Sequence, residues 1–172
     1  IAKEIDFPLI PILARMEHRG IYLAVDALQK MNKKLVQDIK KLEKSIFEHA
    51  GEEFNIASPA QLADVLYDKL ALPTTGVKKG KTGYSTGQEE LDKLRSLHPI
   101  IECIEQYREL TKLQSTYVLA LPELVDTNSY LHTTFNQDVA ATGRLSSTDP
   151  NLQNIPVRTE LGRSIREAFM PA

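Results

Sequence analysis

The sequence contains one cysteine, Cys103, and no tryptophan among its 172 residues. One cysteine cannot form an internal disulfide, which predicts a protein of the reducing cytoplasm. No apolar run approaches the length that crosses a bilayer, and the first residues show no signal-peptide pattern, so we expect no membrane partner. The chain begins on Ile1 rather than Met and ends on Ala172 without a polar tail. We therefore expect it to be a piece of a longer protein.

Sequence motifs for catalysis are also missing. The chain has no Gly-rich phosphate loop, no paired Cys and His spacing for a metal, and no nucleophile elbow. Its four histidines are scattered without ligand spacing. The sequence therefore predicts neither a catalytic residue nor a metal ligand within this chain.

The balance of charge is close to neutral, with 21 basic and 23 acidic residues and a net charge of −2. A dedicated DNA-binding module usually has a clear basic excess. Two segments are nevertheless locally basic: residues 74–87 carry three lysines and no acid, and residues 140–166 carry four arginines and two acids. The distribution of charge thus leaves nucleic acid open as a partner.

Two long helices are predicted from the spacing of apolar residues. Asp26 is predicted to cap the first, which ends near Gly51, and Pro99 to begin the second, which reaches Leu121. A long helix with a narrow apolar stripe needs a partner of similar length. We therefore predict an antiparallel pair with a small insertion at its tip.

The predicted tip consists of two short helices and a loop. Capping boxes at residues 58–61 and 86–89 open the helices, and the loop over residues 73–85 is rich in Gly, Thr and Lys. The groups that could bind phosphates are Lys78, Lys79, Lys81, Thr82, Ser85 and Thr86. A solvated loop whose lysines only confer solubility is an equal alternative.

Shorter elements are predicted outside the helix pair. Residues 7–19 predict a helix followed by an extended stretch over residues 21–25. Residues 130–137 predict a strand that residues 142–147 could join as a hairpin, and residues 163–170 predict a short helix leading into a strand. The fold class is therefore α+β and mostly α, with a long antiparallel helix pair, a small helical tip and a small antiparallel β segment.

A second group of candidate binding residues lies near a polar loop bounded by two prolines. Arg144 follows a predicted turn, and Asn151, Gln153 and Asn154 lie in the loop. Such side chains can contact the minor-groove acceptors that every base pair offers, which checks pair geometry without reading sequence. Alternatively, the loop side chains bond buried backbone, a reading that suits Gln153 better than Arg144.

Five segments together resemble the family A, or DNA polymerase I-like, DNA polymerases of bacteria. Residues 142–158 resemble the signature that precedes the first catalytic motif, and residues 107–117 the second thumb helix. Residues 131–137 resemble the first palm strand, and residues 54–58 and 81–83 the thumb tip. The resemblance covers nearly the whole chain in the order of the family.

This resemblance implies a domain organisation. Residues 1–25 would be a palm-side entry helix and strand, residues 26–127 the thumb, and residues 128–172 the N-terminal part of the palm, truncated before the catalytic motif.

The resemblance also implies roles for individual residues. Arg144 would reach the minor groove at the primer end and sense a correct terminal pair. Asn151 and Asn154 would also contact DNA there. Positions directed toward the duplex would be Arg108, Lys112 and Tyr117, and those along the phosphates Asn55, Ser58, Lys81, Thr82, Ser85 and Thr86. Gln114 and Tyr84 stand where many relatives have a basic residue, so a phosphate contact is not expected at either.

The implied chemistry is template-directed nucleotide addition in replication and repair, with two Mg²⁺ ions at the reacting groups. The metal ligands would lie beyond residue 172, as would the residues that bind the incoming dNTP. The chain would be a monomeric part of a DNA-directed DNA polymerase that binds primer–template duplex DNA but is inactive alone.

Two other classes of function are alternatives: a stand-alone nucleic-acid-binding helical module, and a helical interaction protein whose basic loop is only solvated. The C-terminal segment counts against the first, because Ile165 and Phe169 would have no obvious place to pack against a thumb alone. DNA affinity that is low and independent of salt would favour the second.

Overall fold

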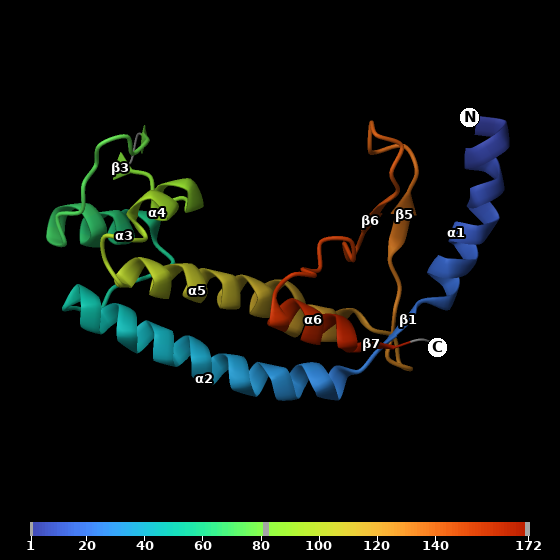
Figure 1. The fold of residues 1–172 in the computed structure, drawn as a ribbon. Helices are drawn as coiled ribbons and strands as arrows, with labels where there is room; N and C mark the ends of the chain where they lie inside the picture. Colours follow the sequence, from blue (N-terminus) through green and yellow to red (C-terminus); the bar gives the residue numbers. More distant parts are fainter. Residues whose placement is uncertain (1, 81–82, 171–172) are drawn as a thin grey trace. The chain divides into compact units, whose positions relative to one another are not determined.

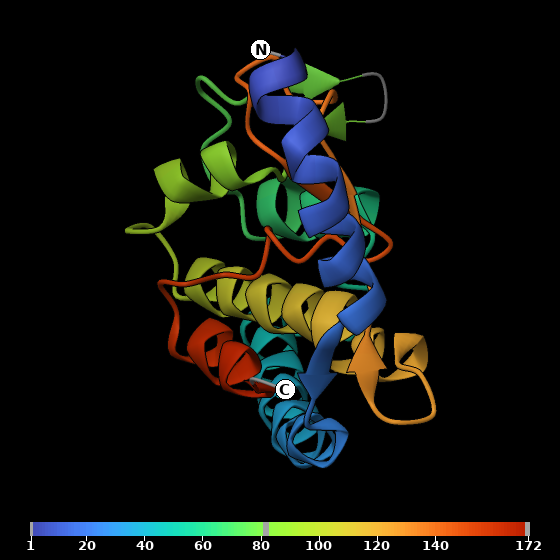
Figure 2. The same ribbon diagram turned by 90° about the vertical axis from the view of Figure 1, so that its right-hand side faces the viewer.

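The computed structural model describes residues 2–80 and 83–170, and the chain divides into two units. One unit comprises Ile1–Lys33 with Leu113–Ala172, and the other comprises Lys34–Lys112 (Figures 1 and 2). Helices predominate, and the sheets are small and antiparallel, which confirms the predicted fold class. Within the described part of the chain, no helix is long and apolar enough to span a membrane.

The first unit begins with a π-helical turn, η1 (Ala2–Asp6), and α1 (Phe7–Arg19), whose bounds match the prediction. Gly20 ends α1 at φ 68°, and β1 (Ile21–Leu23) follows. The next helix, α2, spans Val25–Ala50. It starts before Asp26, so the prediction that Asp26 caps it was wrong. The carboxylate instead lies in the first turn, where the helix dipole still favours it.

A three-stranded sheet joins the two ends of the chain in this unit. β1 lies between β4 (Tyr130–Leu131) and β7 (Phe169–Met170) and is antiparallel to both. Helix α6 (Glu160–Glu167) precedes β7 and begins earlier than predicted, because Thr159 caps it by accepting the Gly162 N–H at 3.1 Å. Ile165 of α6 is fully buried, so this segment has a place to pack within the first unit.

The predicted strand over residues 130–137 is divided between two sheets. β5 (Thr134–Asn136) forms a hairpin with β6 (Ser146–Thr148), as predicted, but the chain leaves β4 at His132. Thr133 lies at this break, and its hydroxyl is 3.0 Å from the carbonyl of Thr148 and 2.8 Å from that of Pro150. These bonds to residues distant in the sequence accompany the turn of the chain from β4 into the hairpin.

The second unit contains the antiparallel part of α2 and α5 (Ile100–Leu113), which lie side by side in Figures 1 and 2. Ser45 Oγ and Cys103 Sγ lie 3.6 Å apart between them. The tip comprises α3 (Pro59–Ala63), η2 (Asp64–Lys69), β2 (Lys79–Gly80), β3 (Gly83–Tyr84) and α4 (Gln88–Leu94). One hydrophobic cluster joins these helices, with Ile46, Leu66, Leu91 and Ile104 all fully buried. The apolar stripes of the two helices therefore form the core of this unit.

The second long helix is not α-helical as far as Leu121. It changes at Gln114 to a π-helical segment, η3 (Gln114–Leu119), and then to η4 (Leu121–Leu124), a 3₁₀ turn. Gln114 Nε2 donates to Asn32 Oδ1 at 2.8 Å, so this side chain bonds to α2 within the first unit.

The two predicted capping boxes behave differently. Ser58 caps α3 by accepting the Gln61 N–H at 3.4 Å, as predicted. Thr86 does not cap α4, because Gly87 occupies the cap position and the Thr86 hydroxyl bonds Arg108. The prediction at Thr86 was therefore wrong.

His132, which follows β4, contacts Glu17 of α1 and Asp126 through its two ring nitrogens. Nδ1 donates to the Glu17 carbonyl at 2.7 Å, and Nε2 lies 3.4 Å from Asp126 Oδ2. The Glu17 carbonyl and, less strongly, Asp126 raise the pKa of His132 above 6.5. A raised pKa contributes stability that is complete below the unfolded value and is lost as pH rises through the folded value.

We therefore expect the free energy of unfolding to fall as pH rises from about 6.5 through the raised pKa of His132, and His132→Asn to reduce this dependence. Urea unfolding of both proteins across that range measures it. An equally steep fall in the variant would contradict the assignment to His132.

Candidate nucleic-acid interface

In the second unit, most of the candidate phosphate-binding residues lie in the loop between η2 and α4. Lys78 Nζ bonds Glu89 at 2.6 Å, and Lys79 Nζ lies 5.0 Å from the centre of the Tyr84 ring. Both lysines therefore have partners inside the chain, although exposed ion pairs of this kind are weak and exchange readily with other anions. Lys81 and Thr82 lie outside the described residues.

Ser85, Thr86 and Arg108 are bonded to the body of the tip. The Ser85 hydroxyl accepts the Gly87 N–H at 3.1 Å, and its carbonyl accepts the Tyr67 hydroxyl at 2.8 Å. Thr86 is 5% exposed, and Arg108 donates to its carbonyl and, at 3.3 Å, to its hydroxyl. Burial lowers the pKa of the Arg108 guanidinium, which stays a cation at neutral pH. These contacts connect α5 to the loop.

Asn55 and Ser58 shape the turn that leads into α3. Asn55 Oδ1 accepts the Ala57 N–H at 3.0 Å, and its own N–H donates to Gln61 Oε1 at 2.7 Å. The Asn55 side chain remains exposed, as does Lys112 on α5. Asn55, Lys79 and Lys112 are therefore exposed, and Asn55 and Lys79 also have contacts inside the chain.

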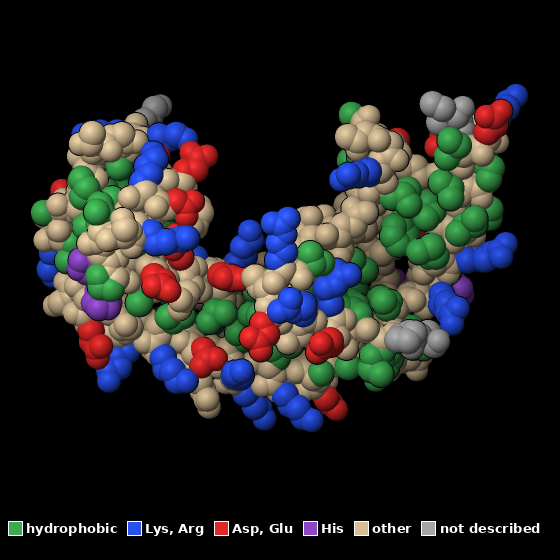
Figure 3. Space-filling view, viewed as in Figure 1, with side chains coloured by type: hydrophobic (Ala, Val, Ile, Leu, Met, Phe, Trp, Pro, Cys, Tyr) green, Lys and Arg blue, Asp and Glu red, His purple; other side chains and the backbone are tan. Residues whose placement is uncertain are grey.

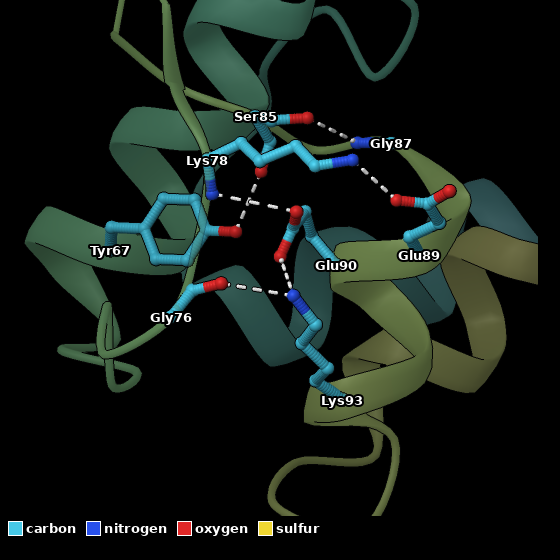
Figure 4. A network of polar contacts seen from close by, with 8 residues as sticks. All are labelled: Tyr67, Gly76, Lys78, Ser85, Gly87, Glu89, Glu90 and Lys93. Atoms are coloured by element: carbon cyan, nitrogen blue, oxygen red, sulfur yellow. Dashed lines mark hydrogen bonds and ion pairs between the residues drawn. The ribbon is translucent and has the colours of Figure 1, made fainter.

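A buried carboxylate in this region was not found from the sequence. Glu90 of α4 bonds Lys93 at 2.7 Å, and its side chain is only 1% exposed. The sequence offered one indication that Glu90 is buried, because Glu90 lies four residues before the buried Leu94 and therefore on the same face of the helix. Figure 4 shows Glu90 and Lys93 beside Gly76 and Lys78 of the loop over residues 73–80 and 83–85, which is called the lysine loop below.

In the first unit, the hairpin β5–β6 and the polar loop after it bring the other candidates together. Arg144 is exposed in the turn after Gly143, which has φ 73°. Asn151 Oδ1 accepts the Gln153 N–H at 3.0 Å, and Gln153 Nε2 donates to the Leu145 carbonyl at 2.8 Å. Both side chains therefore bond backbone of the loop and hairpin, at exposed rather than buried positions.

Tyr117 and Asn154 are joined through backbone rather than side chain. The hydroxyl of Tyr117, a buried residue of η3, donates to the Asn154 carbonyl at 2.6 Å, and burial raises the pKa of Tyr117. The Asn154 side chain is exposed, so its amide can bond an external partner. Arg144 and Asn154 are therefore two exposed side chains of this group whose polar ends can reach an external partner.

The first unit also has an exposed surface that is apolar. Figure 3 shows hydrophobic side chains gathered over α1 and the neighbouring hairpin. The exposed apolar residues of these segments include Phe7, at 59% exposure, and Val139, at 69%. Hydrophobic side chains supply neither the cations nor the donors that DNA requires. This surface is therefore not part of the candidate interface.

Known proteins resemble the chain throughout its length. It is 52% identical to DNA polymerase I of Synechocystis over 172 residues, which are 99% of this chain and 17% of the relative. It is 51% identical to the thermostable DNA polymerase I of Thermus aquaticus, over 98% of this chain and 20% of the relative. The chain thus spans about a fifth of the length of these curated relatives.

A solved structure shares the fold. It is described as the POL domain of Pol1 from M. smegmatis in complex with DNA primer-template and dNTP. It is 41% identical, with a TM-score of 0.86, over 96% of this chain and 29% of that one. The sequence model of DNA polymerase family A matches residues 25–172. The chain therefore belongs to DNA polymerase family A.

Proposed function

We propose that the chain is the primer–template-binding part of a DNA-directed DNA polymerase that acts in replication and repair. The observation that carries this proposal is its likeness, over almost its full length, to a polymerase domain in complex with primer–template DNA and dNTP. Two groups of exposed donors, one in each unit, support it with the chemistry that DNA backbone and minor groove require. A stand-alone nucleic-acid-binding module is less well supported, because the chain matches only about a fifth of each curated relative.

In this proposal the chain is divided as the sequence resemblance implies. Residues 26–127 are the thumb, residues 1–25 are the helix and strand that enter the palm, and residues 128–172 are the first part of the palm. The incoming dNTP and the reacting groups are assigned to other parts of the longer protein. The protein is proposed to be a cytoplasmic monomer.

The candidate residues take two kinds of role. The side chains proposed to contact DNA directly are Arg144 and Asn154 in the minor groove, and Asn55, Lys112, Lys81 and Thr82 along the phosphates. The side chains proposed to position the elements that carry these groups are Arg108, Ser58, Ser85, Thr86, Tyr117, Asn151 and Gln153. A positioning residue weakens binding when it is changed, but it does not alter the number of phosphates contacted.

The Mg²⁺ ions of the proposed reaction do not fit this part of the polymerase. Among residues 2–80 and 83–170, no group of three or more His, Cys, Asp or Glu side chains is placed to hold a metal ion. We propose that the ligands belong to residues that follow position 172. The 172-residue chain is therefore expected to bind a primer–template without extending it, which a primer-extension assay with Mg²⁺ and all dNTPs checks.

DNA binding is tested by fluorescence anisotropy of a labelled primer–template over a salt series, with wild type, Lys81→Ala and Arg144→Ala. The logarithm of the binding constant is expected to fall linearly with the logarithm of salt concentration. Loss of one phosphate contact in Lys81→Ala is expected to reduce the slope by about 0.9. Arg144→Ala is expected to weaken binding with the slope unchanged.

Two results would count against the proposal. Failure of the wild-type chain to bind at low salt would contradict it directly. Binding that does not depend on salt would instead favour the helical interaction protein.

A further inference from the structure

The lysine loop is attached to α4 by a pair of opposite charges, Glu90 and Lys93. Glu90 accepts from Lys93 Nζ at 2.7 Å and from the Lys78 backbone N–H at 3.4 Å. Lys93 Nζ also donates to the carbonyl of Gly76 at 2.9 Å. The pair therefore holds the loop backbone at two points, on both sides of Val77 (Figure 4).

The surroundings of Glu90 favour a structural bond over a solvated charge. The Glu90 side chain is 1% exposed, whereas that of Lys93 is 50% exposed. The hydrogen bond from Lys93 lowers the pKa of Glu90 although burial opposes this, so the carboxylate stays ionised at neutral pH. A buried charge of this kind persists only where its partners satisfy it.

A third attachment lies at the other end of the loop. The Tyr67 hydroxyl donates to the Ser85 carbonyl at 2.8 Å, and burial, followed by the charge of Glu90, raises the pKa of Tyr67. The backbone between Gly76 and Ser85 is thus attached at both ends. Without these attachments, a segment rich in Gly and Lys would sample many conformations.

Glu89 is the contrasting neighbour on the same helix. Its side chain is 76% exposed, and it bonds the side chain of Lys78 at 2.6 Å rather than the loop backbone. Glu89 and Glu90 carry the same charge, one residue apart. Removing either one changes the net charge equally, but only Glu90 contacts the backbone that sets the position of the lysines.

We infer that Glu90 and Lys93 are positioning residues for DNA binding, which hold the lysine loop in the conformation that meets the phosphates. The inference rests on the proposed function. Neither residue contacts DNA itself. Their removal lowers the fraction of molecules with the loop in place, and apparent affinity falls in proportion to that fraction.

The test compares three variants with similar side-chain volume in the 172-residue chain: Glu90→Met, Lys93→Met and Glu89→Met. Glu90→Met and Glu89→Met each make the chain more positive by one charge, which by simple attraction would tighten binding to DNA. We expect Glu90→Met and Lys93→Met to weaken primer–template binding about tenfold, as a fall of the competent fraction to about a tenth would. Glu89→Met is expected to bind as tightly as wild type or more tightly.

Three further readouts separate positioning from phosphate contact and from unfolding. The salt dependence of binding in Glu90→Met is expected to equal that of wild type, whereas a lost phosphate contact would reduce its slope by about 0.9. Titration at high concentration is expected to show that all Glu90→Met molecules bind. Amide exchange is expected to accelerate over residues 76–85 and to stay unchanged in α5.

Binding by Glu90→Met as tight as that by Glu89→Met would overturn the inference alone and leave the proposed function standing. A reduced binding fraction with wild-type affinity would also overturn it, because that result indicates partial unfolding. No binding by the wild-type chain would overturn the proposed function, and the inference with it.

Discussion

Ile104→Ala is expected to lower the free energy of unfolding by about 3–4 kcal/mol, as measured by urea denaturation. Ile104 lies on α5 and is fully buried in the cluster that joins α2, α4 and α5. The substitution removes three carbon atoms from a site enclosed by several elements, where the surroundings cannot fill the space. The cost therefore includes both lost burial and the remaining cavity.

A matched control is Ile12→Ala on α1, where the side chain is 51% exposed. The same chemical change there is expected to cost less than about 0.5 kcal/mol. An equal loss of unfolding free energy at the two positions would show that the cluster around Ile104 is not a main source of the stability of its unit.

Gly20→Ala is expected to lower the free energy of unfolding by about 3 kcal/mol through backbone strain and steric overlap. Gly20 has φ 68° and ψ −171°, a conformation that is almost confined to glycine. A Cβ there would lie 2.8 Å from the carbonyl oxygen of Leu131 and 2.8 Å from Cε1 of His132. Since the first of these atoms is backbone in the β1–β4 pair, the sheet itself would have to move.

Gly51→Ala separates the cost of backbone strain from the cost of steric overlap. Gly51 has φ 73°, but a Cβ there would have no atom within 4 Å. Its expected cost is therefore about 1 kcal/mol, from backbone conformation alone. Thermal unfolding of both variants measures the difference, and a similar loss in each would contradict the close approach at Gly20.

The helical part of the fold could be predicted because its signals are local. Apolar spacing and terminal glycines located α1 and the end of α2, and the Ser58 cap located α3. Local signals were insufficient where a distant group competes. Thr86 has the sequence of a cap, yet Arg108 takes its hydroxyl from 22 positions away.

The β part was predicted less completely for the same reason. Residues 130–137 have the composition of one strand, and composition does not reveal that Thr133 bonds two carbonyls across the hairpin. Ile165 was expected to have no obvious place to pack against a thumb alone. The β1–β7 pairing, which joins residues far apart in the sequence, places this segment against the rest of the unit.

In the candidate site, too, the residue types could be predicted from the sequence, whereas their distant bonding partners could not. Residue types that bind DNA could be recognised at Arg144 and Asn154, which are exposed in the structure. The internal partners of Arg108 and Ser85 could not be predicted, because they depend on how the loop meets α5 and η2. Glu90 was missed because one acid among several on a short helix carries no motif of its own.

The measurement that tests the central claim most directly is a double-mutant cycle between Arg144 and the minor-groove acceptor of the terminal primer base. Anisotropy compares wild type and Arg144→Ala on a primer ending in adenine and on one ending in 3-deazaadenine, which lacks the N3 acceptor. If Arg144 contacts that edge, the two changes should couple by about 1–3 kcal/mol, the strength of a good side-chain contact to a base. If Arg144→Ala weakens binding to both primers equally, the minor-groove role of Arg144 is contradicted.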